Sequence, residues 1–394
     1  MEISDKLDML TAAAEFDVCG YDGTRRNNSP LRFIHRVALP GKKPVCLFKV
    51  LMTNSCVNDC IYCVNQIGRD VPRSFFHPEE LARLFMELNS KRLAHGLFLS
   101  SGIAGDASRT METMIDTVTI LRRHYEFKGY VHLKILPGAS LGCVEEACKL
   151  ANRVSVNMES PTANHLAKLS FKKNLHRDIV ERMRWVRKIA QANQRLLPSG
   201  QTTQFVVGAT DETDRDILSA IKALYQEMEL RRVYFSAFQP IRKSRSEGLL
   251  PASPMRAHRL YQVDWLLRIY GFRLSEVELA LGKGDNFSLT KDPKLVIAQK
   301  QPWLFPLDIN KASYSELIRV PGIGPVSAGR IIETRREHNI FSLEQLKKMG
   351  AVTKRAENFI WIQGMPVLER QASFLPQLEK DLSQRAFSLA GALE

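Results

Sequence analysis

Three cysteines fall within eight residues of this 394-residue chain, at the spacing CxxxCxxC. Cys56, Cys60 and Cys63 lie in a polar segment that directly follows a β-rich run at residues 45–52. Three thiolates on one short loop can wrap a cubane iron–sulfur cluster and ligate three of its four irons. The fourth iron then stays open and can chelate a small molecule, which a closed four-cysteine site cannot do.

A zinc site is the main alternative, with a fourth ligand from elsewhere, such as Cys46 or Cys19. Zinc sites usually show paired CxxC or Cys/His units separated by a spacer, and the sequence has no second pair. Three inert, buried cysteines are a further alternative, which the polar loop disfavours. Cys143 and Cys148 lie five residues apart in a helical stretch and are expected in the core.

The cysteine signature, with Tyr62 just before the last cysteine, resembles the radical S-adenosylmethionine (SAM) superfamily. The resemblance implies a [4Fe–4S] cluster whose open iron binds the amino and carboxylate groups of SAM. It also implies an enzyme that cleaves SAM by one-electron reduction to methionine and a 5′-deoxyadenosyl radical, with an electron donor as partner. In the family, the residue that matches Tyr62 lies beside the adenine of SAM. Simple packing under the loop is the alternative for Tyr62.

The elements that must position this loop are predicted from residues 43 to 275, where short β-rich runs alternate with amphipathic helical patterns. Six such units predict parallel pairing with right-handed crossovers, and they are too few for a closed eight-stranded barrel. We therefore expect an α/β fold, a partial (β/α)6 barrel, with the chemistry at the carboxyl ends of its strands. The expected strands are 45–52, 97–101, 130–136, 153–158, 202–207 and 233–238.

The second expected strand ends at Ser100, Ser101 and Gly102. Many members of the family carry a Gly-Gly-Glu segment here, whose backbone carbonyls contact the ammonium group of SAM. The resemblance assigns this role to the three residues, although the Ser-Ser-Gly sequence departs from the pattern. Lys172 and Lys173 are expected on the surface rather than in the SAM site.

Two later strand ends also resemble SAM-binding segments of the family. Asn157 and Glu159 share one face of the fourth strand, since side chains alternate along a strand. They match the segment that binds the ribose and methionine parts of SAM, and a turn-capping role before Pro161 is the alternative. Gly208 matches a backbone position that touches adenine, or it simply begins the turn into the next helix.

A second pattern lies at residues 309–332, where two short helical stretches flank the turn Pro321-Gly322-Ile323-Gly324. Glycine allows a tight turn, and the N-terminus of the following helix forms a seat for phosphate. The pattern resembles the helix-hairpin-helix motif, which grips the DNA backbone without reading sequence. The four turn residues and Arg330 are the expected nucleic-acid contacts. Further charge is expected from Arg319, Arg335 and Arg336.

A weaker repeat follows at residues 346–360, where Gly350 matches Gly322 but Val352 replaces the second glycine. Phosphate binding by this second hairpin is therefore in doubt, and we expect it to complete a paired fold. A helix-hairpin-helix that makes only protein contacts is the alternative for the whole module.

Lys and Arg exceed Asp and Glu by 14, which favours a polyanionic partner such as nucleic acid over a merely solvated basic surface. No apolar run reaches the twenty or so residues needed to cross a bilayer, and the N-terminus lacks a secretory pattern. We therefore expect a cytoplasmic protein without a membrane partner.

Five parts are expected along the chain. They are an N-terminal extension (1–42), a radical SAM core (43–280), a linker (281–306), an all-α helix-hairpin-helix domain (307–365) and a C-terminal tail or docking helix (366–394). This order resembles a branch of the superfamily described as DNA modification or repair proteins. The alternatives are a radical SAM enzyme that modifies RNA, such as tRNA, and a non-catalytic DNA-binding iron–sulfur protein.

Overall fold

The computed structural model describes residues 2–14, 33–37 and 45–366. The chain forms two compact units, Met1–His258 and Arg259–Glu394, which are described separately below. The division falls within helix α8 (Pro254–Arg268). Most of the expected tail at 366–394, and Cys19, lie outside the described residues.

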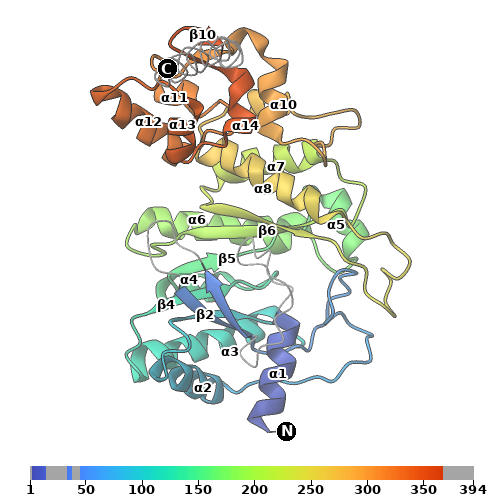
Figure 1. The fold of residues 1–394 in the computed structure, drawn as a ribbon. Helices are drawn as coiled ribbons and strands as arrows, with labels where there is room; N and C mark the ends of the chain where they lie inside the picture. The colour runs from blue at the N-terminus through green and yellow to red at the C-terminus, as the bar shows by residue number, and fades with distance from the viewer. Residues whose placement is uncertain (1, 15–32, 38–44, 367–394) are drawn as a thin grey trace, which may run out of the picture. The chain divides into compact units, whose positions relative to one another are not determined.

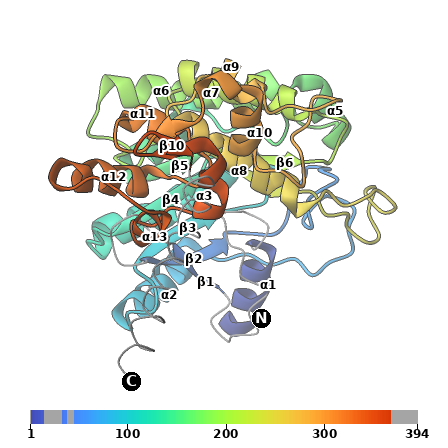
Figure 2. The same ribbon diagram turned by 45° about the horizontal axis from the view of Figure 1, so that its top comes forward.

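The first unit is built on a seven-stranded sheet in the order β1-β2-β3-β4-β5-β6-β7 (Figures 1 and 2). Strands β2 to β7 are parallel, and β1 pairs antiparallel with β2. The predicted α/β partial barrel is confirmed, and β1 is a seventh strand that was not predicted. The strands are β1 (Ile34–Val37), β2 (Val45–Leu51), β3 (Gly96–Ser100), β4 (Tyr130–Lys134), β5 (Arg153–Ser155), β6 (Gln201–Val207) and β7 (Arg232–Ala237).

Helices α2, α3, α4 and α6 pack beside one another in that order, and α1 packs against β2. Every residue of β3 and of β6 is buried, as is typical of parallel strands that are covered on both faces. The remaining elements are α1 (Ile3–Ala14), α2 (Pro78–Ser90), α3 (Ala107–Thr119), α4 (Leu141–Leu150), α5 (Ala163–Leu169), α6 (Glu181–Ala192), α7 (Asp214–Glu227) and the π-helical turns η1 (Ile120–His124) and η2 (Leu175–Val180).

The second unit is mainly helical, but it also contains a small sheet in the order β10-β9-β8. Its core is apolar and includes Leu317, Ile323, Ala328, Ile331 and Leu346. Ile323 and Ala328 are 1% and 0% exposed, so both side chains belong to this core. The elements are α9 (Leu274–Glu278), α10 (Pro293–Lys300), η3 (Pro302–Leu304), β8 (Leu307–Asp308), α11 (Tyr314–Leu317), α12 (Pro325–Glu337), α13 (Leu343–Lys348), α14 (Thr353–Ala356), η4 (Glu357–Phe359), β9 (Ile360–Ile362) and β10 (Met365–Pro366).

The helical region with its hairpin is confirmed, and the short strands are an addition to the expected all-α domain. The expected linker at 281–306 contains α10 and the turn η3. The five-part division itself remains a prediction. Among the described residues, no helix combines the length and the apolar composition that spanning a bilayer requires.

Candidate functional site

The cysteine loop leaves the carboxyl end of β2 and lies against the carboxyl end of β3. The N–H of Gly102 donates to the carbonyl of Thr53 at 2.7 Å, and the N–H of Val57 donates to that of Ile103 at 2.9 Å. The end of β3 therefore lies beside the cysteines, as expected if its residues contact SAM.

Gly102 makes the closest of these approaches. A Cβ atom at this position would lie 2.3 Å from the carbonyl oxygen of Ser55 and 3.3 Å from the Cβ of Cys56. A side chain at residue 102 would thus push the loop away from the strand end. This close approach gives Gly102 a structural role in addition to the SAM contact that we predict for it.

A single guanidinium group, that of Arg73, organises the rest of the loop. It donates to the carbonyl oxygens of Asn54, Asn65, Gln66 and Arg69. The loop carbonyls are thereby satisfied by the protein itself, as buried backbone groups require. Arg73 could not be identified from the sequence, because no local pattern indicates that its side chain folds back on the cysteine loop.

The three cysteines differ in exposure but influence one another. Cys60 is 4% exposed, whereas Cys56 and Cys63 are partly exposed. Burial raises the pKa of the Cys60 thiol, and it raises the pKa of Cys63 to about 12, with a further contribution from the negative charge of Cys60. Thiols in such surroundings become thiolates only when a positive charge compensates them, and metal ions supply that charge.

The protein contributes one positive charge of its own through Lys173. Its ammonium group donates to the hydroxyl of Tyr62 at 3.1 Å and lies 3.4 Å from Oε1 of Glu159. Burial alone would lower the pKa of Lys173, but the charges of Cys60, Glu159 and Cys56 outweigh burial and raise it. The expected surface position of Lys173 is therefore wrong: its side chain is 8% exposed. Lys172 is exposed, as expected.

The donor set of three cysteines suits an iron–sulfur cluster with three protein thiolates. Among the described residues, no three His, Cys, Asp or Glu side chains converge closely enough to hold one metal ion. A cubane is larger than a single ion and each of its thiolates ligates a different iron, so its three ligands lie further apart. Cys46 lies near the opposite end of β2 from the loop, roughly 15 Å away at the rise of a β-strand, so it cannot be the fourth zinc ligand.

Two buried polar atoms near the loop have no hydrogen-bond partner among the described residues. They are the hydroxyl oxygen of Ser101, at the end of β3, and Nε2 of Gln66, just after the last cysteine. Unsatisfied buried polar groups are costly and call for a partner. These atoms fit a polar ligand such as SAM beside the cysteines. Gln66 was not identified from the sequence, and Ser100 is buried at 1% exposure.

Asn157 and Glu159 occupy different surroundings. Asn157 lines a small internal cavity with residues from β3 to β7, whereas Glu159 faces Lys173 beside the cysteines. Glu159 adopts a φ of 64°, so the strand alternation does not continue to it. The other residues that line the cavity are Phe98, His132, Lys134, Ser155, Thr202, Thr203, Gln204 and Tyr234.

Gly208 forms a turn with a φ of 80° after β6, and its N–H donates to the carboxylate of Glu212. A Cβ at residue 208 would lie 2.5 Å from the Cβ of Ala252. The turn and the close approach account for glycine at this position. The predicted contact between its backbone and adenine remains a prediction.

In the second unit, two hairpins face one another. Gly322 and Gly350 have φ values of 87° and 91°, in agreement with their expected equivalence. The N–H of Val352 donates to the carbonyl of Gly322 at 2.8 Å, and a Cβ at residue 322 would lie 2.4 Å from the carbonyl oxygen of Val352. The second hairpin thus supports the first.

The helix that follows the first hairpin, α12, begins at Gly324 without a capping side chain. Its first N–H groups and its dipole therefore favour an anion. Ile323 is buried, and its carbonyl accepts a hydrogen bond of 2.6 Å from Lys294. Pro321 is also buried, so any contact between this hairpin and a phosphate depends on its backbone.

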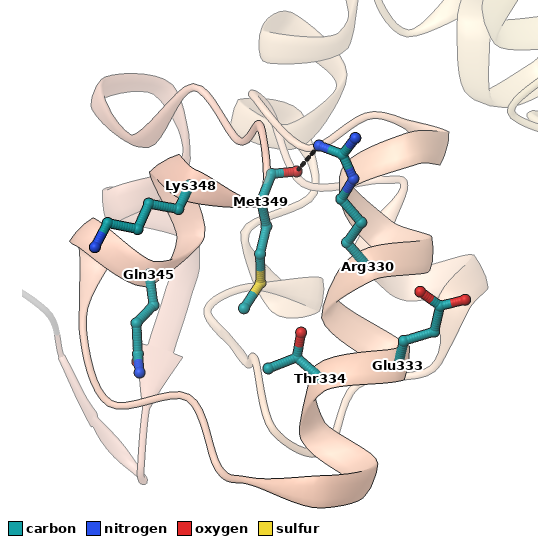
Figure 3. A pocket seen from close by; sticks show the side chains of 6 residues that line it. All are labelled: Arg330, Glu333, Thr334, Gln345, Lys348 and Met349. Carbon is teal, nitrogen blue, oxygen red and sulfur yellow. Dashed lines mark hydrogen bonds between the residues drawn. The ribbon is translucent and has the colours of Figure 1, made fainter. Parts of the chain in front are cut away.

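Arg330 is exposed on α12 and lines a pocket between α12 and α13 (Figure 3). Its guanidinium donates to the carbonyl of Met349 at 3.3 Å, which fixes it beside the second hairpin. Arg319 instead pairs with Glu276, and Arg335 donates to the carbonyls of Ile309 and Ala312. The other residues that line the pocket are Glu333, Thr334, Gln345 and Lys348.

Two regions of the chain match known families, and they contain the cysteine loop and the first hairpin. Residues 50–224 match the radical SAM superfamily, and residues 306–356 match the helix-hairpin-helix motif. The chain therefore carries a radical SAM domain followed by a helix-hairpin-helix motif. A radical SAM domain implies a [4Fe–4S] cluster and SAM as cofactors.

Solved structures with a similar fold include HydG, a maturase of the [FeFe]-hydrogenase, with 13% identity, a TM-score of 0.44 and coverage of 56% of this chain and 49% of that one. Methylornithine synthase (PylB) is 15% identical, with a TM-score of 0.44 and coverage of 55% of this chain and 59% of that one. The cobalamin-dependent radical SAM enzyme OxsB is 12% identical, with a TM-score of 0.35 and coverage of 73% of this chain and 45% of that one. The chain spans about half the length of these proteins, and similarity at this level carries no argument about substrate. No curated protein matches the chain.

Proposed function

We propose that this chain is a cytoplasmic radical SAM enzyme that modifies or repairs nucleic acid, with DNA favoured over RNA. The observation that carries the proposal is the presence of two specialised parts on one chain. One part is the loop that holds Cys56, Cys60 and Cys63 against the end of β3, and the other is the pair of hairpins at Gly322 and Gly350. The net charge of +14 suits a polyanionic substrate.

When bound, the cluster and SAM supply a one-electron cleavage that yields a hydrogen-abstracting radical, and an external electron donor is required. The residues of the chain have separate tasks in this proposal. Arg73 shapes the loop, Lys173 compensates the thiolates, and Ser101 and Gln66 offer polar atoms to SAM. The start of α12 holds phosphate through backbone N–H groups. A target base inside a duplex would have to leave the stack to react.

The test is anaerobic incubation of the cluster-loaded protein with SAM, a reductant and one nucleic acid at a time. Single-stranded DNA, duplex DNA and tRNA are the three substrates, and mass analysis follows both 5′-deoxyadenosine and the nucleosides. A new nucleoside from DNA supports the proposal, and one from tRNA alone supports the RNA alternative. If 5′-deoxyadenosine never forms although DNA binds, the chain is a non-catalytic DNA-binding protein.

A further inference from the structure

An exposed aromatic ring stands directly beside the cysteine loop. Phe171, two residues after the end of α5, is 77% exposed. One face of its ring is covered by the guanidinium of Arg245, whose carbon lies 4.2 Å from the ring centroid. Single exposed apolar residues are common and need no explanation, but this ring is held in place by a network of contacts.

Asp59, within the cysteine loop, is the centre of that network. Its carboxylate accepts hydrogen bonds from the N–H of Phe171 at 3.1 Å and from the hydroxyl of Ser170, and it pairs with Arg245 at 3.1 Å. The ring, the guanidinium and the cysteine loop are thus tied to one carboxylate.

Exposed cations lie next to both partners along the chain. Lys172 follows Phe171, and Arg242 and Lys243 precede Arg245; all four cations are exposed. The segment that carries Arg242 is connected to the cysteine loop, because Arg69 donates to the carbonyl of Arg242 at 3.4 Å. The surface therefore combines an aromatic face with several cations, the combination that binds single-stranded nucleic acid.

We propose that Phe171 and Arg245 form a stacking platform for one unpaired base of a nucleic-acid substrate. The inference rests on the proposed function, because it takes the substrate to be nucleic acid. A base on this platform would lie beside the cysteine loop, since the N–H of Phe171 is bonded to Asp59. Stacking does not discriminate between bases, because every base has an aromatic face. The platform therefore holds an unpaired nucleotide without selecting its identity.

The test uses the full-length protein and single-stranded DNA that carries 2-aminopurine, whose fluorescence falls when it stacks on an aromatic ring. We expect quenching by the wild-type protein, a loss of quenching and about a tenfold weaker affinity for Phe171→Leu, and retention of both by Phe171→Trp. The matched control is Tyr125→Leu. Tyr125 is another exposed aromatic, but it follows η1 and precedes β4, at the amino ends of the strands.

Equal quenching by the wild-type and Phe171→Leu proteins would overturn the platform, as would weaker binding by Phe171→Trp. The same loss in Tyr125→Leu would overturn it as well, because the effect would not be specific to Phe171. This assay needs no SAM and no turnover. A wild-type protein that shows quenching yet never forms 5′-deoxyadenosine would therefore refute the proposed enzyme and leave the platform intact.

Discussion

The ammonium group of Lys173 lies 3.4 Å from Oε1 of Glu159, and both side chains are almost completely buried. The pair joins the segment after β5 to the cysteine loop, because the same ammonium group donates to the hydroxyl of Tyr62. In a buried pair of this kind each charge compensates the other. Removing one partner therefore lowers the free energy of unfolding more than removing both does.

Lys173→Met should therefore destabilise the first unit by about 3–5 kcal/mol, because it leaves Glu159 buried without its counter-charge. The double variant Lys173→Met/Glu159→Gln should recover much of this loss. Urea unfolding under anaerobic conditions measures both effects, with Lys172→Met as the exposed control. Additive losses in the double variant would show that the two side chains are not energetically coupled.

Cys60→Ala should abolish iron and sulfide incorporation and the formation of 5′-deoxyadenosine, because it removes one of three cluster ligands. DNA binding through the hairpins should be retained, since they belong to the other unit. The matched control is Cys148→Ala, which removes a fully buried cysteine of α4 and should keep the cluster. Undiminished SAM cleavage by Cys60→Ala would refute the cluster assignment.

The two glycines of the first hairpin should respond differently to substitution. Gly322→Ala should destabilise the module by about 1–2 kcal/mol or more, because the φ of 87° is unfavourable for alanine and its Cβ would clash with Val352. At Gly324, a Cβ meets only the Tyr270 hydroxyl, at 3.3 Å, so Gly324→Val should leave the module folded while its bulk obstructs phosphate.

Thermal unfolding and DNA titrations at several salt concentrations separate these two effects. Gly329→Ala is the control, because a Cβ there meets nothing within 4 Å. DNA affinity for Gly324→Val that matches the wild type at every salt concentration would remove this hairpin from DNA binding.

Lys294 should make the stability of the second unit depend on pH. Burial, with a contribution from the charge of Arg319, lowers the pKa of Lys294 to about 7, against 10.5 when it is exposed. Between these values the unfolded chain binds more protons than the folded one, so stability should rise with pH, by a few kcal/mol at most. Below pH 7 this contribution should be constant.

The slope of unfolding midpoint against pH, compared between wild type and Lys294→Met, measures this contribution. Lys291→Met, which removes an exposed lysine nearby, should keep the slope of the wild type. Identical slopes for wild type and Lys294→Met would contradict the assigned pKa.

Strands β2 to β7 could be predicted because each lies in a run with several apolar residues between helical patterns. Strand β1 has four residues, and β8 and β10 have two each, too few to show a periodicity. These strands form through pairing with partners that local sequence does not reveal. The candidate site could also be predicted from local sequence, because its three cysteines lie close together at the spacing CxxxCxxC.

The surroundings of that site could not be predicted. Lys172 and Lys173 are adjacent and identical in type, yet one is exposed and the other is buried against Tyr62. Which one turns inward depends on the path of the chain after α5, and nothing in the dipeptide encodes it. Arg73 and Gln66 were missed for the same reason, since their partners are brought to them by the fold.

The hydrogen bond from the N–H of Val352 to the carbonyl of Gly322 means that the two hairpins have different roles. The second hairpin, with valine in place of the second glycine, stabilises the backbone turn of the first. Val352→Pro would remove this donor, and we therefore expect it to weaken the proposed phosphate binding by the first hairpin, although Val352 itself would not contact the phosphate.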